Sequence, residues 1–344
     1  LGDTEGRYPT DQGFDEWYGI PNSSDRAFWP DSDSFQQDAG VEFTYITTSS
    51  RGETPKKHEV YDRAKRTTID REITDHAIEF IKRTTKTKKP FFAYLPYTQT
   101  HEPVDAHPDF KGKTGNGSFA DVLAQTDVYV GELLDTIDEL GIKDNTIFIF
   151  TSDNGGTHFD NNPLRGVKGM FTEGGIRVPL IASWPGVIPT DAVTDRMVHG
   201  IDLYPTCLEL AGKQWTPSSD VHPLDGESFA KVLRNLDMEG KRAPIFYLFP
   251  GYMDIRAQPC VVAIDEVGGK RYKLLYFYEA DAWQLYNISE DIGEENNLIA
   301  DKPRIAAQLS KKIDAWLSQK HPTWQPKYPL DKKTGKSAGP PPVL

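Results

Sequence analysis

A carboxylate and an amide stand side by side where an apolar segment ends. The segment is "NTIFIF" (residues 145–150), and Asp153 and Asn154 follow it in "SDNGG". Their side-chain oxygens are hard donors that suit Ca²⁺ or Mg²⁺, although two ligands are too few for calcium. Asp-Asn-Gly is also a common turn sequence, because Asn and Gly tolerate positive φ. The residues therefore predict either part of a divalent-cation site or a plain turn after a strand.

Two further side chains could bind an anionic group. His101 follows the apolar run "PFFAYLPY" (residues 90–97), and a loop histidine at the end of a buried strand can be functional or simply exposed. Lys168 lies in "NPLRGVKGMFTEGGIRVP", where glycines let the backbone approach a ligand and the ammonium group offers a point charge. The alternative for Lys168 is a solvated surface loop. The segment has no P-loop spacing and does not predict nucleotide binding.

Other polar and aromatic residues have weaker claims. His199, in "MVHGIDLYP", has apolar neighbours and is interpreted as a structural histidine. Cys207 and Cys260 lack metal-like spacing, and Cys207 is interpreted as a buried thiol. The remaining candidates either flank the site or form a pocket wall or core packing: His158, Asp160, Tyr8, Trp17, Phe28 and Trp29.

The composition and net charge limit the classes of partner that this chain can bind. The chain has 344 residues and a formal net charge of −12, which argues against binding a nucleic-acid backbone or an anionic membrane surface. No apolar stretch reaches the length of a membrane span, and the first residues show no signal-peptide pattern. An anionic substrate would therefore need a local positive pocket.

The order of the predicted elements indicates the fold class. A helix is expected from about Asp62, a buried strand at 90–97, a second helix from Ser118 to Gly141, and a strand at 145–150. Ser118 and Asp121 have capping-box spacing. Helices alternating with buried strands predict an α/β fold with a mostly parallel central sheet flanked by helices. Ligands bind at the carboxyl ends of such strands, where "TQTHEP" and "SDNGG" both lie.

The texture of the chain changes near Lys241. Residues 1–240 are expected to form the α/β domain, beginning with an irregular excursion of about sixty residues that could wall a pocket. Residues 241–330 are expected to form a small α+β domain, because "CVVAIDEV", "YKLLYFYE" and "WQLYNIS" look like antiparallel strands and are followed by a helix around 305–317. Residues 331–344 are expected to be an extended tail.

Six segments together resemble the arylsulfatase family of the alkaline-phosphatase-like superfamily. They are "GFDEWYGIP", "KPFFAYLPYTQTHEP", "ADVLAQTDVYVGELLDTIDELGIKDNTIFIFTSDNGG", "PLRGVKGMFTEGGIRVPLIASWPG", "IDLYPTCLELAG" and "WQLYNISEDIGEENNL". The resemblance implies hydrolysis of sulfate esters on a small molecule or carbohydrate. It implies that Asp153 and Asn154 bind a divalent cation, usually Ca²⁺, and that His101 and Lys168 bind the sulfate group. Glu173 and Arg177 are interpreted as organising the loop.

The sequence also departs from the family pattern. Family members carry paired metal-binding aspartates, a Cys-x-Pro-x-Arg motif whose cysteine becomes a formylglycine nucleophile, and a Lys-x-His pair before the Leu-Gly that opens this chain. None of these occurs here. If the chain is a complete molecule, we therefore expect it to be inactive and to bind Ca²⁺ weakly or not at all. If it is truncated, the parent protein is expected to be a sulfatase, and the uncovered sheet edge should pair with a partner or with a second copy. Two other functions stay open: a phosphoester or phosphonate hydrolase, and a catalytically silent sulfatase fragment.

Overall fold

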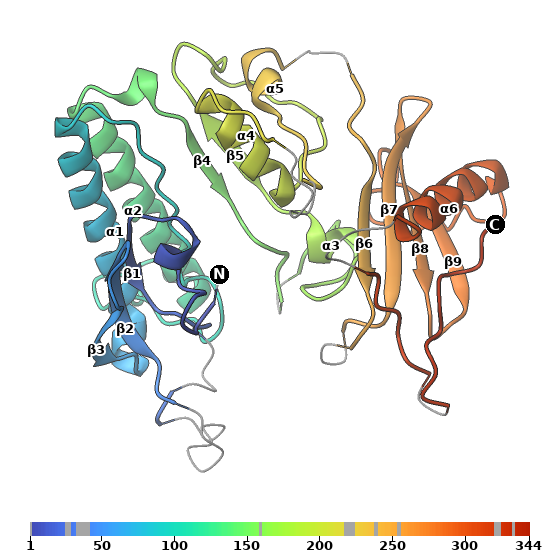
Figure 1. The fold of residues 1–344 in the computed structure, drawn as a ribbon, viewed down its shortest axis with the longest axis horizontal. Helices are drawn as coiled ribbons and strands as arrows, with labels where there is room; N and C mark the ends of the chain where they lie inside the picture. The colour runs from blue at the N-terminus through green and yellow to red at the C-terminus, as the bar shows by residue number, and fades with distance from the viewer. Residues whose placement is uncertain are drawn as a thin grey trace. The chain divides into compact units, whose positions relative to one another are not determined.

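The computed structural model divides into two compact units, Leu1–Thr146 and Ile147–Leu344 (Figure 1). The structure describes residues 2–24, 29–31, 42–157, 160–216, 224–236, 240–252, 256–319, 325–331 and 334–344.

The first unit combines two long helices with a small antiparallel sheet of order β1-β2-β3. Its first long helix begins after Asp62, whose Oδ1 accepts a hydrogen bond from the Lys65 N–H at 2.8 Å. The helix predicted from about Asp62 is confirmed, and its Ile69 and Ile81 side chains are buried. The elements are η1 (Pro9–Gln12), β1 (Glu16–Gly19), β2 (Tyr45–Ser50), β3 (Lys56–Val60), α1 (Arg63–Lys86), α2 (Ser118–Glu139) and η4 (Lys143–Asn145).

Helix α2 begins at Ser118 as predicted, and Gly141 follows its end with a φ of +66°. The predicted capping box at this helix is wrong. The Asp121 carboxylate accepts the N–H groups of Gly112 and Thr114, at 2.7 and 3.0 Å, and the Thr114 hydroxyl at 2.7 Å. Asp121 therefore fastens the preceding loop onto the helix, because two backbone donors already reach its carboxylate.

The strand predicted at residues 90–97 is not formed among the described residues. These residues have no ladder partner, and Phe92 and Tyr94 keep 59% and 62% of their surface exposed. An apolar run predicts burial, but a strand exists only where a neighbouring strand supplies hydrogen bonds. None of the described strands pairs with residues 90–97.

The second unit holds two separate sheets. Strands β4 and β5 pair antiparallel, with Phe148 opposite Ser183 and Thr151 opposite Leu180. The parallel pairing expected from the sequence is absent among the described strands, because every described ladder is antiparallel. The elements are β4 (Phe148–Thr151), α3 (Glu173–Ile176), β5 (Leu180–Ser183), η5 (Gly200–Asp202), α4 (Leu203–Leu210), α5 (Ala230–Arg234), β6 (Ile245–Phe249), β7 (Cys260–Val267), β8 (Lys270–Phe277), β9 (Ala282–Asn287) and α6 (Pro303–Leu317).

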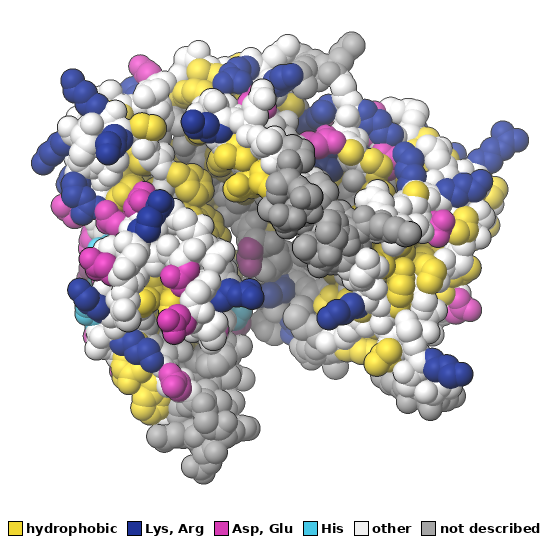
Figure 2. All heavy atoms as spheres, viewed as in Figure 1, with side chains coloured by type: hydrophobic (Ala, Val, Ile, Leu, Met, Phe, Trp, Pro, Cys, Tyr) yellow, Lys and Arg dark blue, Asp and Glu magenta, His cyan; other side chains and the backbone are white. Residues whose placement is uncertain are grey.

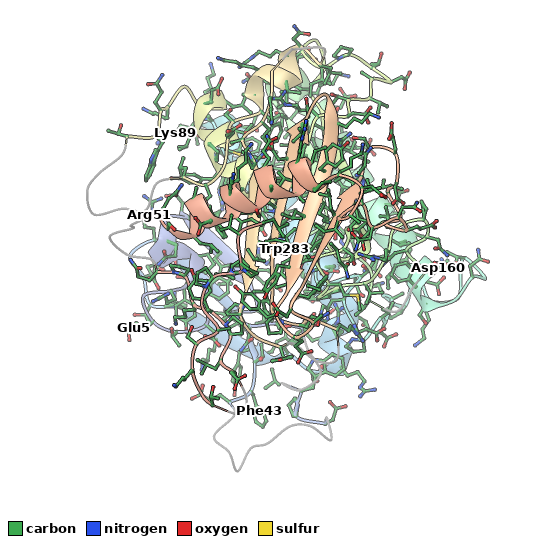
Figure 3. The ribbon with its side chains drawn as sticks, turned by 90° about the vertical axis from the view of Figure 1, so that its right-hand side faces the viewer. Glu5, Phe43, Arg51, Lys89, Asp160 and Trp283 are labelled. Atoms are coloured by element: carbon green, nitrogen blue, oxygen red, sulfur yellow. The ribbon has the colours of Figure 1, made fainter. Side chains whose placement is uncertain are left out.

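The larger sheet is an antiparallel meander of order β6-β7-β8-β9, and helix α6 crosses one of its faces (Figure 3). The predicted strands over β7, β8 and β9 and the predicted helix α6 are confirmed. Leu309 and Ile313 of α6 pack on one face of the sheet with Leu274 and Leu285. The opposite face carries a second apolar cluster that includes Cys260. The domain boundary near residue 241 stays a prediction.

The surface carries charges of both signs. On the face in Figure 2, Lys and Arg side chains are interspersed with acidic ones and form no single patch. Within the described residues, no helix has the length and apolar character needed to cross a membrane.

Candidate active site

Asp153 and Asn154 lie on an exposed turn directly after β4. The Asn154 Nδ2 donates to the Asp153 Oδ2 at 2.6 Å, and the Ser152 hydroxyl donates to the Asn154 carbonyl at 3.1 Å. The turn interpretation of "SDNGG" is therefore correct as far as local geometry goes. It does not exclude ligand binding, since the Asp153 carboxylate is exposed.

The donors at this turn have the right chemistry for a hard divalent cation but are too few. Ca²⁺ takes about six to eight oxygen ligands. In the part of the chain that the structure describes, no group of three or more His, Cys, Asp or Glu side chains could hold a metal ion. Asp153 and Asn154 by themselves do not make a cation site.

The loop that carries Lys168 runs alongside this turn. The Lys168 backbone N–H donates to the Gly156 carbonyl at 2.9 Å, and the Gly155 N–H donates to the Gly175 carbonyl at 3.1 Å. The structure thus brings Lys168 next to the Asp153–Asn154 turn, which the sequence could only suggest. Lys168 is half-buried, and no described acidic side chain forms an ion pair with its Nζ.

The glycines of this loop allow backbone segments to touch each other. A Cβ on Gly155 would lie 1.9 Å from the Gly174 carbonyl oxygen, and a Cβ on Gly174 would lie 2.2 Å from the Gly166 oxygen. Contacts this short are sterically forbidden, so these positions require glycine. The expectation that the glycines admit a ligand is replaced, at these positions, by close packing of the loop on itself.

Asn161 is a key residue that the sequence analysis missed. Its Nδ2 donates to three carbonyl oxygens, those of Gly156 at 3.2 Å, Gly166 at 3.0 Å and Gly174 at 3.2 Å. One amide group thereby joins the turn after β4 to both arms of the Lys168 loop. An asparagine in a glycine-rich stretch carries no sequence signal for this role, because loop asparagines are common.

Glu173 and Arg177 organise the loop, as the sequence analysis interpreted them. Arg177 Nη1 lies 3.2 Å from the Glu173 Oε2 within the single turn of α3. Glu173 is buried and also lies 2.8 Å from the Nζ of Lys273, on strand β8.

His101 belongs to the first unit, on the loop after residues 90–97. Two buried residues of α1 hold that loop by its backbone. The Arg66 Nη2 donates to the carbonyls of Thr98 and His101, both at 2.9 Å. The Asp70 carboxylate accepts the N–H groups of Thr98 at 2.8 Å and Gln99 at 3.0 Å. Burial raises the pKa of the Asp70 carboxyl, while the backbone donors and Arg66 oppose that rise.

The His101 ring is exposed and oriented by a neighbouring carbonyl. Its Nδ1 lies 2.6 Å from the Glu102 carbonyl oxygen. A carbonyl only accepts, so Nδ1 carries the proton. The Nε2 atom is then an acceptor in the neutral ring and a donor in the protonated ring. His101 can therefore donate to an anion through Nε2 only when the ring is charged.

The remaining candidates have structural roles or lie outside the described residues. His199 accepts the Ile201 N–H at Nδ1, and burial lowers its pKa, which confirms the structural interpretation. The expectation that Cys207 is a buried thiol is wrong, because Cys207 is only half-buried, although burial still raises its pKa. Cys260 is buried, and burial raises its pKa to about 12. Neither thiol suits a nucleophile, because the reactive form is the thiolate.

The described aromatic candidates and the flanking acid Asp160 make local contacts within their own units. Trp29 is buried against Tyr61 in the core, and Tyr8 stacks on Trp17 at 5.6 Å. Asp160 accepts hydrogen bonds from Asn162. His158 and Phe28 lie outside the described residues.

Helices, sheets and polar loops at strand ends make this an α/β protein. The chain belongs to the sulfatase family: the family model described as Sulfatase matches residues 3–213. A second model, described as N-sulphoglucosamine sulphohydrolase, C-terminal, matches residues 167–321. The crystal structure of PsFucS1 sulfatase from Pseudoalteromonas sp. has a TM-score of 0.78 at 22% identity over 92% of this chain and 68% of that one, and it shows the shared alkaline-phosphatase-like fold.

Individual relatives agree with this assignment. A sulfatase of Formosa agariphila is 38% identical over 276 residues, which cover 71% of this chain and 49% of that protein. The N-acetylgalactosamine-6-sulfatase of Canis lupus familiaris is 32% identical over 70% of this chain and 45% of that protein. The crystal structure of Ps i-CgsB in complex with k-i-k-neocarrahexaose is 26% identical, has a TM-score of 0.73, and covers 94% of this chain and 71% of that one. The chain spans about half the length of these curated relatives.

Proposed function

We propose that this chain is the sulfate-binding part of a sulfuric ester hydrolase. The observation that carries the proposal is the backbone bond from Lys168 to Gly156, which sets the lysine beside the Asp153–Asn154 turn in a chain of the sulfatase family. A sulfate ester carries negative oxygens throughout its hydrolysis. Fixed cations stabilise that charge, most strongly where it grows in the transition state.

Lys168 and His101 have separate roles in this proposal. The Lys168 ammonium binds non-bridging sulfate oxygens as a point charge, without an acidic partner among the described residues to compete. His101, when protonated, can bind a sulfate oxygen by donating from Nε2. Glu102 fixes the ring by accepting from Nδ1.

The proposed reaction also needs a divalent cation and a nucleophile. We propose that Asp153 and Asn154 supply two of the ligands of a divalent cation, Ca²⁺ in the family pattern, and that further ligands join them. The formylglycine nucleophile would also come from residues outside the printed sequence, because neither Cys207 nor Cys260 has a Cys-x-Pro-x-Arg setting. The chain alone should then turn over no aryl sulfate. Measured turnover by the purified chain would refute this part.

A sulfated carbohydrate is the proposed substrate class. One similar protein is named an N-acetylgalactosamine-6-sulfatase, and a similar structure was solved with k-i-k-neocarrahexaose bound. Sulfate and phosphate esters of the same sugar separate this proposal from a phosphoester hydrolase. We expect the sulfate ester to bind more tightly.

The central test is sulfate binding measured by isothermal titration calorimetry with sodium sulfate. Lys168→Ala should weaken binding about tenfold or more, since a charge-assisted hydrogen bond is worth about 1.5–3 kcal/mol. The matched control is Lys213→Ala, which removes an exposed lysine of the same unit. Equal affinity in the two variants would contradict the proposal and favour a catalytically silent module.

We also propose self-association through β4 and β5. Among the described strands β4 pairs only with β5, and Ile181 and Leu180 keep 62% and 40% of their surface exposed. An apolar edge of this kind pairs readily with a second copy. Ile181→Lys should shift the purified chain toward monomer in sedimentation velocity, and an unchanged distribution would speak against this interface.

A further inference from the structure

The short helix α3 joins three parts of the second unit. Through Gly175 it accepts the N–H of Gly155, from the Asp153–Asn154 turn. Through Gly174 it donates to the Arg165 carbonyl at 2.7 Å, at the base of the Lys168 loop. Both segments of the candidate site therefore depend on where α3 lies.

A buried charge cluster fixes α3 to the large sheet. The Lys273 Nζ lies 2.8 Å from the Glu173 Oε1 and 3.0 Å from the Glu294 Oε1. The Glu173 N–H also donates to the Glu294 Oε2 at 2.8 Å. Lys273 and Glu294 keep 0% and 1% of their surface exposed. Glu173, Lys273 and Glu294 therefore form one connected network, although Glu173 lies far from the other two in the sequence.

Arginines border the cluster on its more exposed side. The Arg165 guanidinium lies over the Tyr286 ring at 4.7 Å, donates to the Tyr286 hydroxyl at 3.1 Å and lies 3.6 Å from Glu294. Arg177 lies beside Glu173. Two carboxylates thus meet one fully buried cation and two half-exposed ones. The buried cation carries most of the compensation, because exposed charges are screened by water.

We propose that Lys273 is a positioning residue for the sulfate-binding loop. It holds Glu173, and through α3 it sets the turn at Asp153 and the loop at Lys168 without touching substrate itself. The connection runs from Lys273 to Glu173, then from Gly174 to Arg165, and by the Asn161 amide to the Gly156 carbonyl that accepts from Lys168. The functional part of this inference rests on the proposed role of Lys168.

An ionic anchor suits this position because it has a preferred direction as well as a strength. A hydrophobic contact tolerates sliding, since its energy depends on buried area and not on direction. A lysine between two carboxylates has a defined position, and displacement leaves buried charges unpaired. The network therefore sets the position of α3 on the sheet and also stabilises its packing there.

The test is hydrogen exchange of the full chain with residue resolution. Lys273→Met should speed exchange of the Gly155, Lys168 and Gly174 amides about tenfold or more, while amides of α6 and β7 stay within about twofold. The matched control is Lys312→Met. Lys312 also pairs with a buried carboxylate of this unit, that of Asp265, and its loss should leave the three loop amides unchanged.

A second variant keeps the test informative if Lys273→Met leaves too much buried charge to fold. Lys273→Met combined with Glu294→Gln removes one buried carboxylate with the cation and should show the same loop-specific exchange. Equal acceleration in α6 and in the loop would mean general destabilisation and would overturn the positioning role. Failure of both variants to fold would overturn it as well.

Sulfate titration then separates this inference from the proposed function. Lys273→Met should weaken sulfate binding by a smaller factor than Lys168→Ala, and the double variant should do the same. If Lys168→Ala leaves sulfate affinity unchanged, the proposed function fails while the exchange result still decides the role of Lys273. If the loop amides do not respond, the positioning role fails whatever the affinity.

Discussion

Two loops carry the candidate site residues, and they are held in place in different ways. The loop at residues 98–101 in the first unit is held by Arg66 and Asp70, four residues apart on one helix. The loop at residues 153–177 in the second unit is held by Lys273, which lies 100 positions from Glu173. One anchor comes from a single neighbouring helix, and the other needs a separate sheet.

The comparison shows how each loop should respond to damage. Arg66 and Asp70 lie on one face of α1 because residues four apart on a helix are neighbours. Their loop should therefore stay ordered as long as α1 is formed. The second loop depends on the packing of α3 against β8, so changes in the large sheet should reach Lys168.

The largest effect is expected at the first anchor. Arg66→Met removes the charged donor of the Thr98 and His101 carbonyls and should cost about 3 kcal/mol or more of unfolding free energy, measured by urea denaturation, because each hydrogen bond to a charged group is worth about 1.5–3 kcal/mol. The control is Arg83→Met on the same helix, whose exposed pair with Glu16 is worth about 0–1 kcal/mol. Similar losses in both variants would mean that the first loop has no special anchor.

The glycine contacts of the second loop come next. Gly174→Ala places a Cβ 2.2 Å from the Gly166 oxygen, and overpacking of this kind costs about 1–3 kcal/mol. Gly131→Ala in α2 meets nothing within 4 Å and should stabilise by about 0.5–1 kcal/mol, because alanine favours a helix. Calorimetric melting of both variants would test the opposite signs. A Gly174→Ala protein as stable as the parent would show that the loop packs more loosely.

Asn161 should give an effect of similar or smaller size. Asn161→Ala removes the donor shared by three carbonyls and should cost about 1–3 kcal/mol, with weaker sulfate binding. Asn162→Ala is the matched control, since Asn162 is exposed and bonds only to Asp160 among the described residues. We expect the control to keep its sulfate affinity. Equal loss in the two variants would remove the special role of Asn161.

The smallest predicted effect is the change in folding stability at acid pH. Burial disfavours the charged form of Asp265, but Lys241 and Lys312 outweigh it and hold its pKa below the usual 3.8. Stability from this group is therefore complete above the unfolded pKa and is lost as the pH falls through the lower folded pKa. Asp70 has a raised pKa, so its contribution has the opposite sign and grows as the pH falls.

Urea unfolding between about pH 5 and pH 2 would measure this difference, because the loss begins near the unfolded pKa and continues below it. Asp265→Asn should flatten the loss of stability at the acid end. Asp195→Asn changes an exposed carboxylate of the same unit and should leave the profile as it is. A profile of Asp265→Asn that matches the parent would show that the two lysines do not set the acid response.

Local sequence signals located much of the fold. Short segments rich in β-branched and aromatic residues placed β7, β8 and β9, and helical spacing placed α1, α2 and α6 within a few residues. The same signals failed at residues 90–97 and at Asp121, because a strand needs a partner and a cap needs a free donor. Both depend on segments that lie elsewhere in the chain.

The sequence by itself determined the family, the three longest helices, strands β7, β8 and β9, and the identity of Asp153, Asn154, His101 and Lys168 as candidates. Each of these depends on residue type and short-range spacing. Only the tertiary structure decided that Asn161 joins three carbonyls and that Lys273 meets two buried glutamates. The physical reason is distance along the chain. Residues about a hundred positions apart form an ion pair only after the sheet and α3 have packed, and no local pattern marks them in advance.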